Sequence, residues 1–136
     1  MDAFDTDVLI YAAVPDHLLG RRVRALFPSV RGAMAGVGSV LLLPEVLAKP
    51  MRERADDAVA ELNELLGRLE LYPVDRTMVE LAASLGASYR LRAADAVHLA
   101  TAVLAGADRF ITNNKGDFPK SIAEVDVTYP EDLPPG

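Results

Sequence analysis

The sequence predicts an α/β fold built around a mainly parallel sheet of four to five strands. Short apolar segments rich in β-branched residues alternate along the chain with longer segments in which apolar residues recur at helical spacing. This alternation indicates parallel strands, because each parallel connection needs a crossover that is usually a helix. The chain has 136 residues, of which 51% are hydrophobic, so we expect a single domain over residues 1–136 with a buried core.

The first segment, AFDTDVLIYA at residues 3–12, allows two interpretations. Its apolar and β-branched residues are consistent with one buried strand. Alternatively, a strand ends at Phe4 and Asp5, and Thr6 or Asp7 then caps a short helix. The later segments with strand character are residues 32–38, which could also be a turn, and residues 69–74, 109–112 and 125–128.

Five segments have the periodicity of helices, and several follow a residue type that commonly caps a helix. Asp16, Ser39 and Asp75 are expected to cap the first, second and fourth of these helices. Pro44 should bend the second helix or shift its start. The expected helices span residues 18–27, 40–54, 56–69, 78–90 and 94–104.

The composition excludes several classes of site. There is no cysteine, so disulfides, thiolate chemistry and cysteine-based zinc sites are excluded. The formal net charge of −6 argues against nonspecific binding of nucleic acid, although basic residues cluster at positions 21–31 and 49–54. No apolar run is long enough for a membrane helix, and the acidic residues near the start are not typical of a signal peptide. We therefore expect a soluble, cytoplasmic protein with no membrane association.

Three acidic residues lie in apolar surroundings. Asp5 lies in FDTDVLI, Glu45 in LLLPEVLA and Asp95 in AADAVHLA. A buried carboxylate without a partner is costly, so such groups are usually protonated, paired or bound to a metal ion. Ligands bind beyond the carboxyl ends of parallel strands, and both Asp5 and the polar segment NNKGDF are expected to lie there.

These residues predict a site for a divalent cation that prefers oxygen ligands. Without cysteine, and with only two histidines, the available carboxylate and amide oxygens favour Mg²⁺ or Mn²⁺ over zinc. Such a cation can orient a phosphodiester and activate a water molecule. The residues alone therefore favour metal-assisted phosphoryl or phosphodiester chemistry.

Each of these acids also has a purely structural interpretation. Asp5 could cap the helix after it, Asp95 could interact with the dipole at a helix N-terminus, and Glu45 could be solvated. Asp117 could be a turn residue. His98, one helical turn after Asp95, is expected to be packed or at the surface rather than a catalytic base. The coincidence of the acids at strand and helix ends favours the functional interpretation.

Four motifs together resemble the PIN domain and, within that family, the VapC-type ribonuclease toxins of bacterial toxin–antitoxin systems. The motifs are FDTDVLIYA, SVLLLPEVLAKP, AADAVHLATA and ITNNKGDF, and their order and spacing cover nearly the whole chain. The resemblance implies a three-layer α/β/α sandwich. It also favours the second interpretation of residues 3–12, in which a strand ends at Asp5 and a short capped helix follows.

The resemblance implies a set of catalytic residues. Asp5, Glu45 and Asp95 match the first three acids of the family. Asn114 stands where the family commonly has another acid, so Asp117 is expected to take that role. Asp5 and Asp95 would hold Mg²⁺ or Mn²⁺. Glu45 and Asp117 would complete the ligand shell, partly through water, and help to deprotonate the attacking water.

Other residues match positions around this site. Asp7 stands where the family usually has Asn or Ser, and it is expected to cap a helix rather than to bind the metal ion. The residues expected to line the pocket are Thr6, Thr112, Asn113 and Asn114. The residues expected to contact RNA phosphates are Arg21, Arg22, Arg24, Lys49, Arg52 and Arg54.

The function implied by the resemblance is metal-dependent hydrolysis of RNA by an endoribonuclease toxin. The resemblance also implies a homodimer and a cognate antitoxin that occupies the RNA groove. Two other functions fit parts of the sequence. A PIN-like module that binds RNA or a partner without cutting is compatible with Asn114. The triplet Asp5-Thr6-Asp7 resembles the motif of an aspartate-nucleophile phosphatase, but Leu9 stands where that motif has Thr.

Overall fold

Five short strands form one parallel sheet in the computed structural model, which describes residues 1–136. The strands are β1 (Asp2–Phe4), β2 (Gly36–Ser39), β3 (Leu69–Tyr72), β4 (Arg109–Ile111) and β5 (Asp126–Thr128). Their order across the sheet is β3-β2-β1-β4-β5, so β1 lies at the centre, and every neighbouring pair is parallel. The predicted fold class and number of strands are confirmed.

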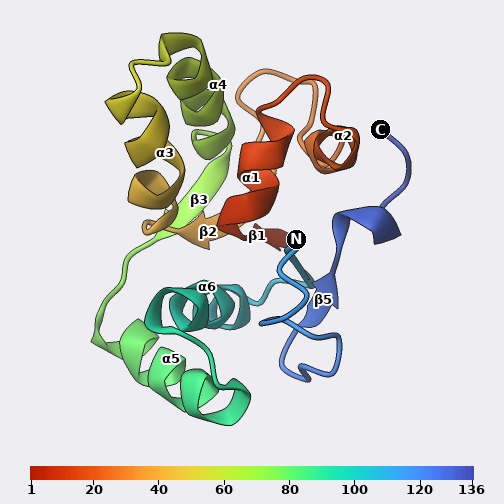
Figure 1. Ribbon diagram of the computed structural model, residues 1–136. Helices are drawn as coiled ribbons and strands as arrows, with labels where there is room; N and C mark the ends of the chain where they lie inside the picture. Colours follow the sequence, from red (N-terminus) through yellow and green to blue (C-terminus); the bar gives the residue numbers. More distant parts are fainter.

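Helices cover both faces of the sheet and give the three layers that the family resemblance implied. The helices are α1 (Thr6–Ala12), α2 (Leu18–Arg24), α3 (Leu42–Arg52), α4 (Asp56–Leu66), α5 (Arg76–Tyr89), α6 (Ala93–Leu104) and a 3₁₀ turn, η1 (Pro130–Asp132). Helices α1 to α4 lie on one side of the sheet, and α5 and α6 lie on the other (Figure 1). None of these helices is both long and apolar enough to cross a membrane.

Alternate residues of the central strands enter two separate cores. In β1, Ala3 packs with residues of α5 and α6, whereas Phe4 packs with residues of α1, α3 and α4. In β4, Phe110 and Ile111 divide in the same way. Successive side chains of a strand point to opposite faces, so a strand covered on both sides has apolar residues at consecutive positions.

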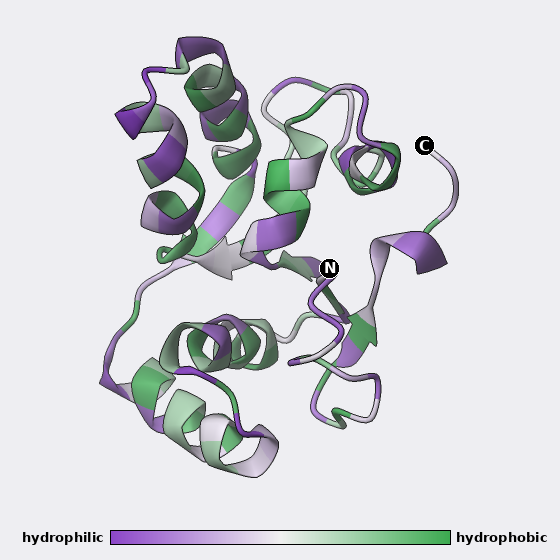
Figure 2. Cartoon of the chain, in the orientation of Figure 1, coloured by the Kyte–Doolittle hydropathy of each residue, from purple (hydrophilic) through white to green (hydrophobic).

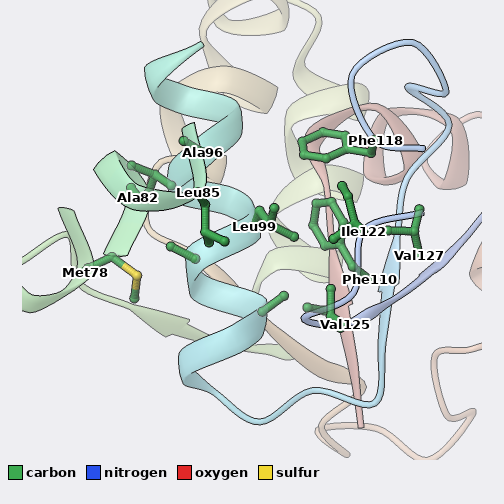
Figure 3. Packing of buried hydrophobic residues seen from close by; sticks show 14 of the residues in the cluster. Met78, Ala82, Leu85, Ala96, Leu99, Phe110, Phe118, Ile122, Val125 and Val127 are labelled. Atoms are coloured by element: carbon green, nitrogen blue, oxygen red, sulfur yellow. The ribbon is translucent and has the colours of Figure 1, made fainter. Parts of the chain in front are cut away.

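The core beneath α5 and α6 also contains the end of the polar segment that follows β4. The rings of Phe110 and Phe118 meet edge to face, with centroids 5.0 Å apart, and Leu99 of α6 and Val127 of β5 lie beside them (Figure 3). Helix α6 is hydrophobic over most of its length (Figure 2), because it is packed between α5 and the sheet. The burial of Phe118 fixes one end of the loop at residues 112–118.

The second interpretation of residues 3–12 is confirmed, and the cap is Asp5, as its structural interpretation predicted, rather than Thr6 or Asp7. Strand β1 ends at Phe4, and Asp5 is the N-cap of α1, with its Oδ1 accepting a hydrogen bond of 2.8 Å from the backbone N–H of Thr6. Asp5 has the extended backbone that an N-cap requires, because it directly follows the strand. Asp7, which was expected to be a cap, lies in the first turn of the helix.

The predicted cap of α2 is wrong. His17, rather than Asp16, caps α2, because its Nδ1 accepts a hydrogen bond of 3.0 Å from the backbone N–H of Gly20. The Tyr11 ring stacks on the His17 ring, with centroids 4.3 Å apart, and holds it in place. Helix α2 ends at Arg24, three residues earlier than predicted.

Helix α3 shows that Pro44 shifts the helix start. The helix begins at Leu42 instead of residue 40, so Pro44 lies in its first turn, where the missing N–H loses no helical hydrogen bond. The prediction that Ser39 caps this helix is wrong, because Ser39 ends β2 and its hydroxyl accepts from the backbone N–H of Leu41 at 3.1 Å in the turn before the helix. The prediction for Asp75 is confirmed, since it caps α5 by accepting from the Met78 N–H at 2.9 Å.

Arg68 connects the end of α4 to the segment that leads into β2. Only 11% of its side chain is exposed, although it carries a charge. Its Nε donates to Ala33 O at 2.6 Å, and its Nη2 donates to Val30 O at 3.2 Å and to Pro28 O. Its Nη1 pairs with Glu64 at 3.0 Å. One guanidinium thus satisfies three carbonyl groups of a segment that has no regular structure.

We expect Arg68→Ala to lower the free energy of unfolding by about 2–3 kcal/mol, because half-buried carbonyl groups lose their donor. Urea denaturation measures this change. Arg76→Ala is a matched control, since Arg76 also pairs with a Glu four residues away but has a side chain that is 90% exposed. The control should cost about 0.5 kcal/mol or less. Equal losses in the two variants would contradict the role assigned to Arg68.

Candidate functional site

The carboxyl ends of β1, β2 and β4 lie at one edge of the sheet, because these strands are parallel and paired with one another. Helices α1 and α3 start at this edge, directly after β1 and β2. Helix α6 also starts there, because it runs back to the amino end of β4. The first turns of three helices and the loop after β4 therefore surround one space.

Asp5 is the buried acid of this edge, with 4% of its surface exposed. Its Oδ1 accepts from the Thr6 N–H, and its Oδ2 accepts from the Thr112 hydroxyl at 2.7 Å. Its own N–H donates to Ile111 O at 3.0 Å, which joins the end of β1 to the end of β4. Burial raises the pKa of Asp5, and the hydrogen bonds offset only part of that rise. A nearby cation would therefore favour the ionised form.

Glu45 reaches the site from the first turn of α3 and meets two donors. Its Oε1 accepts from the Thr6 hydroxyl at 2.7 Å and from Nε2 of His98. The hydrogen bond from His98 lowers the pKa of Glu45, so this carboxylate is ionised at neutral pH. Burial alone would lower the pKa of His98, but the bond to Glu45 and the charge of Asp5 raise it. His98 is packed, as expected, but the sequence did not reveal that it contacts Glu45.

Asp95 lies in the first turn of α6 and is half-buried. Burial raises its pKa, and the negative charges of Asp5 and Asp117 raise it further. Glu45 adds to this effect and His98 opposes it. The predicted carboxylates of β1, α3, α6 and the loop after β4 are thus close enough to destabilise one another's ionised forms.

The loop after β4 places Asp117 through Asn114. The Asn114 side chain donates from Nδ2 to Asp117 Oδ2 at 2.9 Å and accepts from the Asp117 N–H at 3.2 Å. The backbone N–H of Asn114 donates to the Thr112 hydroxyl at 3.1 Å, and that hydroxyl donates to Asp5. Asn114, which replaces an expected acid, therefore orients its neighbour and is linked to the central acid through one hydroxyl group.

Asp7 fixes the start of the same loop, a role that the sequence did not reveal. Its Oδ2 accepts from the backbone N–H of Asn113 at 3.0 Å, while its Oδ1 accepts from the Val8 N–H at 2.7 Å. The Asn113 amide in turn donates to the Tyr11 hydroxyl at 3.4 Å. Burial, followed by the charge of Asp5, raises the pKa of Asp7 to about 7. In the sequence, the only signal of this contact is the pair of acids, Asp5 and Asp7, on either side of Thr6.

The end of the chain holds the other side of the loop. The Tyr129 hydroxyl donates to Phe118 O at 2.8 Å, and Lys115 forms an ion pair with Glu131. The ammonium groups of Lys115 and Lys120 lie 5.3 and 5.1 Å from the centre of the Tyr129 ring. These contacts join residues 115–120 to residues 129–131, which explains how a short polar loop keeps a defined position.

The basic residues predicted to contact RNA fall into two groups. Arg22 donates to Leu133 O at 2.8 Å and to Glu131 O at 3.1 Å, and Arg24 pairs with Glu61, so both have intramolecular partners. The others form no ion pair with an acidic side chain and are exposed; they are Arg21, Lys49, Arg52 and Arg54.

The carboxylates of the candidate site are suitable ligands for a cation that prefers oxygen. None of Asp5, Glu45, Asp95 and Asp117 forms an ion pair with Lys or Arg, and their mutual repulsion raises the pKa of Asp95. A divalent cation among them would relieve this repulsion. No three of the acidic and histidine side chains converge closely enough to make a preformed metal-binding group, so binding of a cation would require side-chain rotation.

Comparisons with known proteins agree with this fold. The sequence model of the PIN domain family matches residues 3–123. A solved structure described as a toxin–antitoxin complex from Klebsiella pneumoniae contains a chain of the same fold, with a TM-score of 0.72 and 23% sequence identity. The match covers 96% of this chain and 98% of the other. Among curated proteins, none matches the sequence significantly.

The matched region begins at Ala3 in β1 and ends at Ala123, so it includes the first turns of α1, α3 and α6 and the loop after β4. It therefore contains each of the four carboxylates that lie at the carboxyl edge of the sheet. The matched residues make up most of the chain. The chain belongs to the PIN domain family.

Proposed function

We propose that this protein is a metal-dependent endoribonuclease and acts as the toxin of a toxin–antitoxin pair. The observation that carries the proposal is the group of four carboxylates at the carboxyl edge of the sheet, none of which is paired with Lys or Arg. Acids that raise one another's pKa and have no Lys or Arg among them are an arrangement that a divalent cation would stabilise. PIN domains are generally nucleases, which is consistent with phosphodiester hydrolysis at this site.

Asp5 and Asp95 would hold Mg²⁺ or Mn²⁺, with Glu45 and Asp117 completing the ligand shell partly through water. The cation, when bound, would lower the pKa of a water molecule and stabilise charge on the phosphate. The protein would supply rigid placement: Thr6 and Thr112 fix both oxygens of Asp5. Glu45, whose pKa is lowered, is available as an ionised base for the proton of the attacking water.

RNA would approach across the exposed basic residues that have no ion-pair partner. Lys49 lies one turn after Glu45 on α3, and Arg52 follows in the last turn of the same helix. Their charges would offset the repulsion between the phosphates and a protein of net charge −6. Arg21 and Arg54 are further candidates, whereas the intramolecular contacts of Arg22 and Arg24 make those two residues less available.

An antitoxin partner and a homodimer are part of the proposal, as is a cytoplasmic location. The antitoxin is supported by the Klebsiella structure, which is described as a toxin–antitoxin complex and has the same fold. The homodimer and location rest on the resemblance to VapC-type toxins. A PIN module that binds without cutting is the main alternative, because Asn114 replaces an acid and no metal-binding group is preformed.

We expect Asp5→Asn and Asp95→Asn each to reduce cleavage of RNA by at least about 100-fold, because each removes a charged metal ligand. The measurement is gel-based cleavage of a mixed cellular RNA with Mg²⁺ or Mn²⁺, beside a chelator control. Both variants should keep the circular dichroism spectrum of the parent protein.

Asp126→Asn is the matched control for these variants. Asp126 is exposed and starts β5, so it lies at the opposite edge of the sheet from the candidate site. This variant should cleave RNA at the parental rate. Full activity in both site variants would refute the metal-site assignment, and a parent protein inactive with either metal ion would favour the non-cutting module.

The raised pKa of Asp7 predicts a pH-dependent stability in the metal-free protein. Because its pKa of about 7 exceeds the ordinary value of 3.8, Asp7 contributes stability below pH 4 that is lost as pH rises through 7. Relative to Asp7→Asn, the parent should lose about 1–2 kcal/mol between pH 4 and pH 8, after allowance for its partial exposure. Urea denaturation in chelator measures this difference. A difference that does not change with pH would contradict the expectation.

A further inference from the structure

His98 is a buried polar residue whose ring makes hydrogen-bonding contacts through only one of its two nitrogens. Its surface is 2% exposed, and it lies on α6, one turn after Asp95. Nε2 of the ring contacts Glu45 Oε1, whereas the buried Nδ1 has no hydrogen-bond partner. Burying an unpaired ring nitrogen has a cost. The contact with Glu45 is the feature that distinguishes His98 from a residue that serves packing alone.

The two donors around Glu45 act on the same carboxylate oxygen. The Thr6 hydroxyl donates to Oε1 at 2.7 Å, and the His98 ring approaches the same atom. Thr6 Oγ1 and His98 Nε2 lie 3.4 Å apart, so the oxygen is held between two neighbouring groups. A carboxylate oxygen accepts about two hydrogen bonds, which leaves Oε2 as the free oxygen of Glu45.

Glu45 needs this support because little else holds its side chain. The side chain is 34% exposed and begins in the first turn of α3, and it forms no ion pair with Lys or Arg. A Glu side chain has three rotatable bonds, and fixing them costs conformational entropy. Thr6 and His98 come from α1 and α6, so the two donors tie the position of Glu45 to the helices that carry Asp5 and Asp95.

We propose that His98 is a positioning residue that, together with Thr6, saturates Oε1 of Glu45 and so leaves Oε2 as the oxygen that is free to act in the reaction. This inference rests on the proposed nuclease function. His98 itself does not contact the substrate, because its ring is buried and its Nε2 faces Glu45 Oε1 and Thr6 Oγ1. Its effect is exerted through Glu45, in the way that buried partners of metal-site residues generally orient those residues.

The test compares His98→Leu with His98→Gln. Leu removes the donor but keeps an apolar side chain of similar volume, whereas the Gln amide can still donate to Glu45. We expect His98→Leu to lower kcat for RNA by roughly 10- to 100-fold with little change in KM, because the oriented base is lost and not the RNA contacts. His98→Gln should recover most of kcat. Isothermal titration calorimetry with Mn²⁺ should give the same order, with the parent protein binding Mn²⁺ most tightly, His98→Gln next and His98→Leu least tightly.

Thr101→Val is the matched control for loss of a buried polar group on the same helix. Thr101 is 1% exposed and lies one turn after His98 on α6, and its hydroxyl donates to Val97 O at 2.8 Å and contacts Met78 of α5 rather than Glu45. This variant should lower the melting temperature without changing kcat. Equal kcat values for the parent and His98→Leu, or equal losses for the Leu and Gln variants, would overturn the inference.

A separate measurement distinguishes failure of this inference from failure of the proposed function. A double-mutant cycle of His98→Leu and Glu45→Gln, followed by urea denaturation in chelator, needs no activity. The double variant should lose less stability than the sum of the two single losses, because both changes remove the same contact. Additive losses would overturn the positioning role. A parent protein that does not cleave RNA, combined with non-additive losses, would refute the nuclease function alone.

Discussion

The hydrogen bond from the Thr112 hydroxyl to Asp5 joins the two strands on which the rest of the site depends. Asp5 directly follows β1 and caps α1, while Thr112 directly follows β4 and its hydroxyl accepts a hydrogen bond from the backbone N–H of Asn114. One buried carboxylate thus sets the start of a helix and the path of the loop that carries Asp117. Loss of this bond would leave a buried anion with a single donor and would release the loop, so local stability and site geometry rest on the same atoms.

The site is arranged at the expense of stability. Asp5, Asp7 and Asp95 all have raised pKa values, because burial and mutual repulsion oppose their ionised forms. A sequence selected for stability alone would place a Lys or Arg among these acids. Asp2, at the opposite edge of the sheet, has such a partner and pairs with Arg109. The absence of such a partner at the carboxyl edge is what a cation site requires, because a fixed ammonium or guanidinium group would occupy it.

The fold could be predicted from the sequence because its signals are local. The alternation of strands and helices, the cap of α5 at Asp75 and the effect of Pro44 all depend on neighbouring residues. Capping of α1 and α2 was predicted less well, since Asp5 and His17 are selected as caps by backbone geometry and by a stacked ring, which composition does not show. Acids at strand and helix ends indicated the candidate site.

Contacts that join distant residues could not be predicted in the same way. His98 and Glu45 are 53 residues apart, and Asp7 and Asn113 are 106 apart, so no short pattern links either pair. The role of Asn114 was likewise hidden, because its side chain acts on Asp117 and not in the place of the expected acid. Parallel sheets bring the ends of distant strands together, and the chemistry formed there is visible only in three dimensions.

The most direct test of the central claim is a crystal structure of the protein grown or soaked with Mn²⁺, analysed by anomalous scattering. We expect an anomalous peak at the carboxyl edge of the sheet, within bonding distance of oxygens of both Asp5 and Asp95. The absence of a peak between these two carboxylates, at an Mn²⁺ concentration that fully occupies sites elsewhere, would contradict the metal-site assignment.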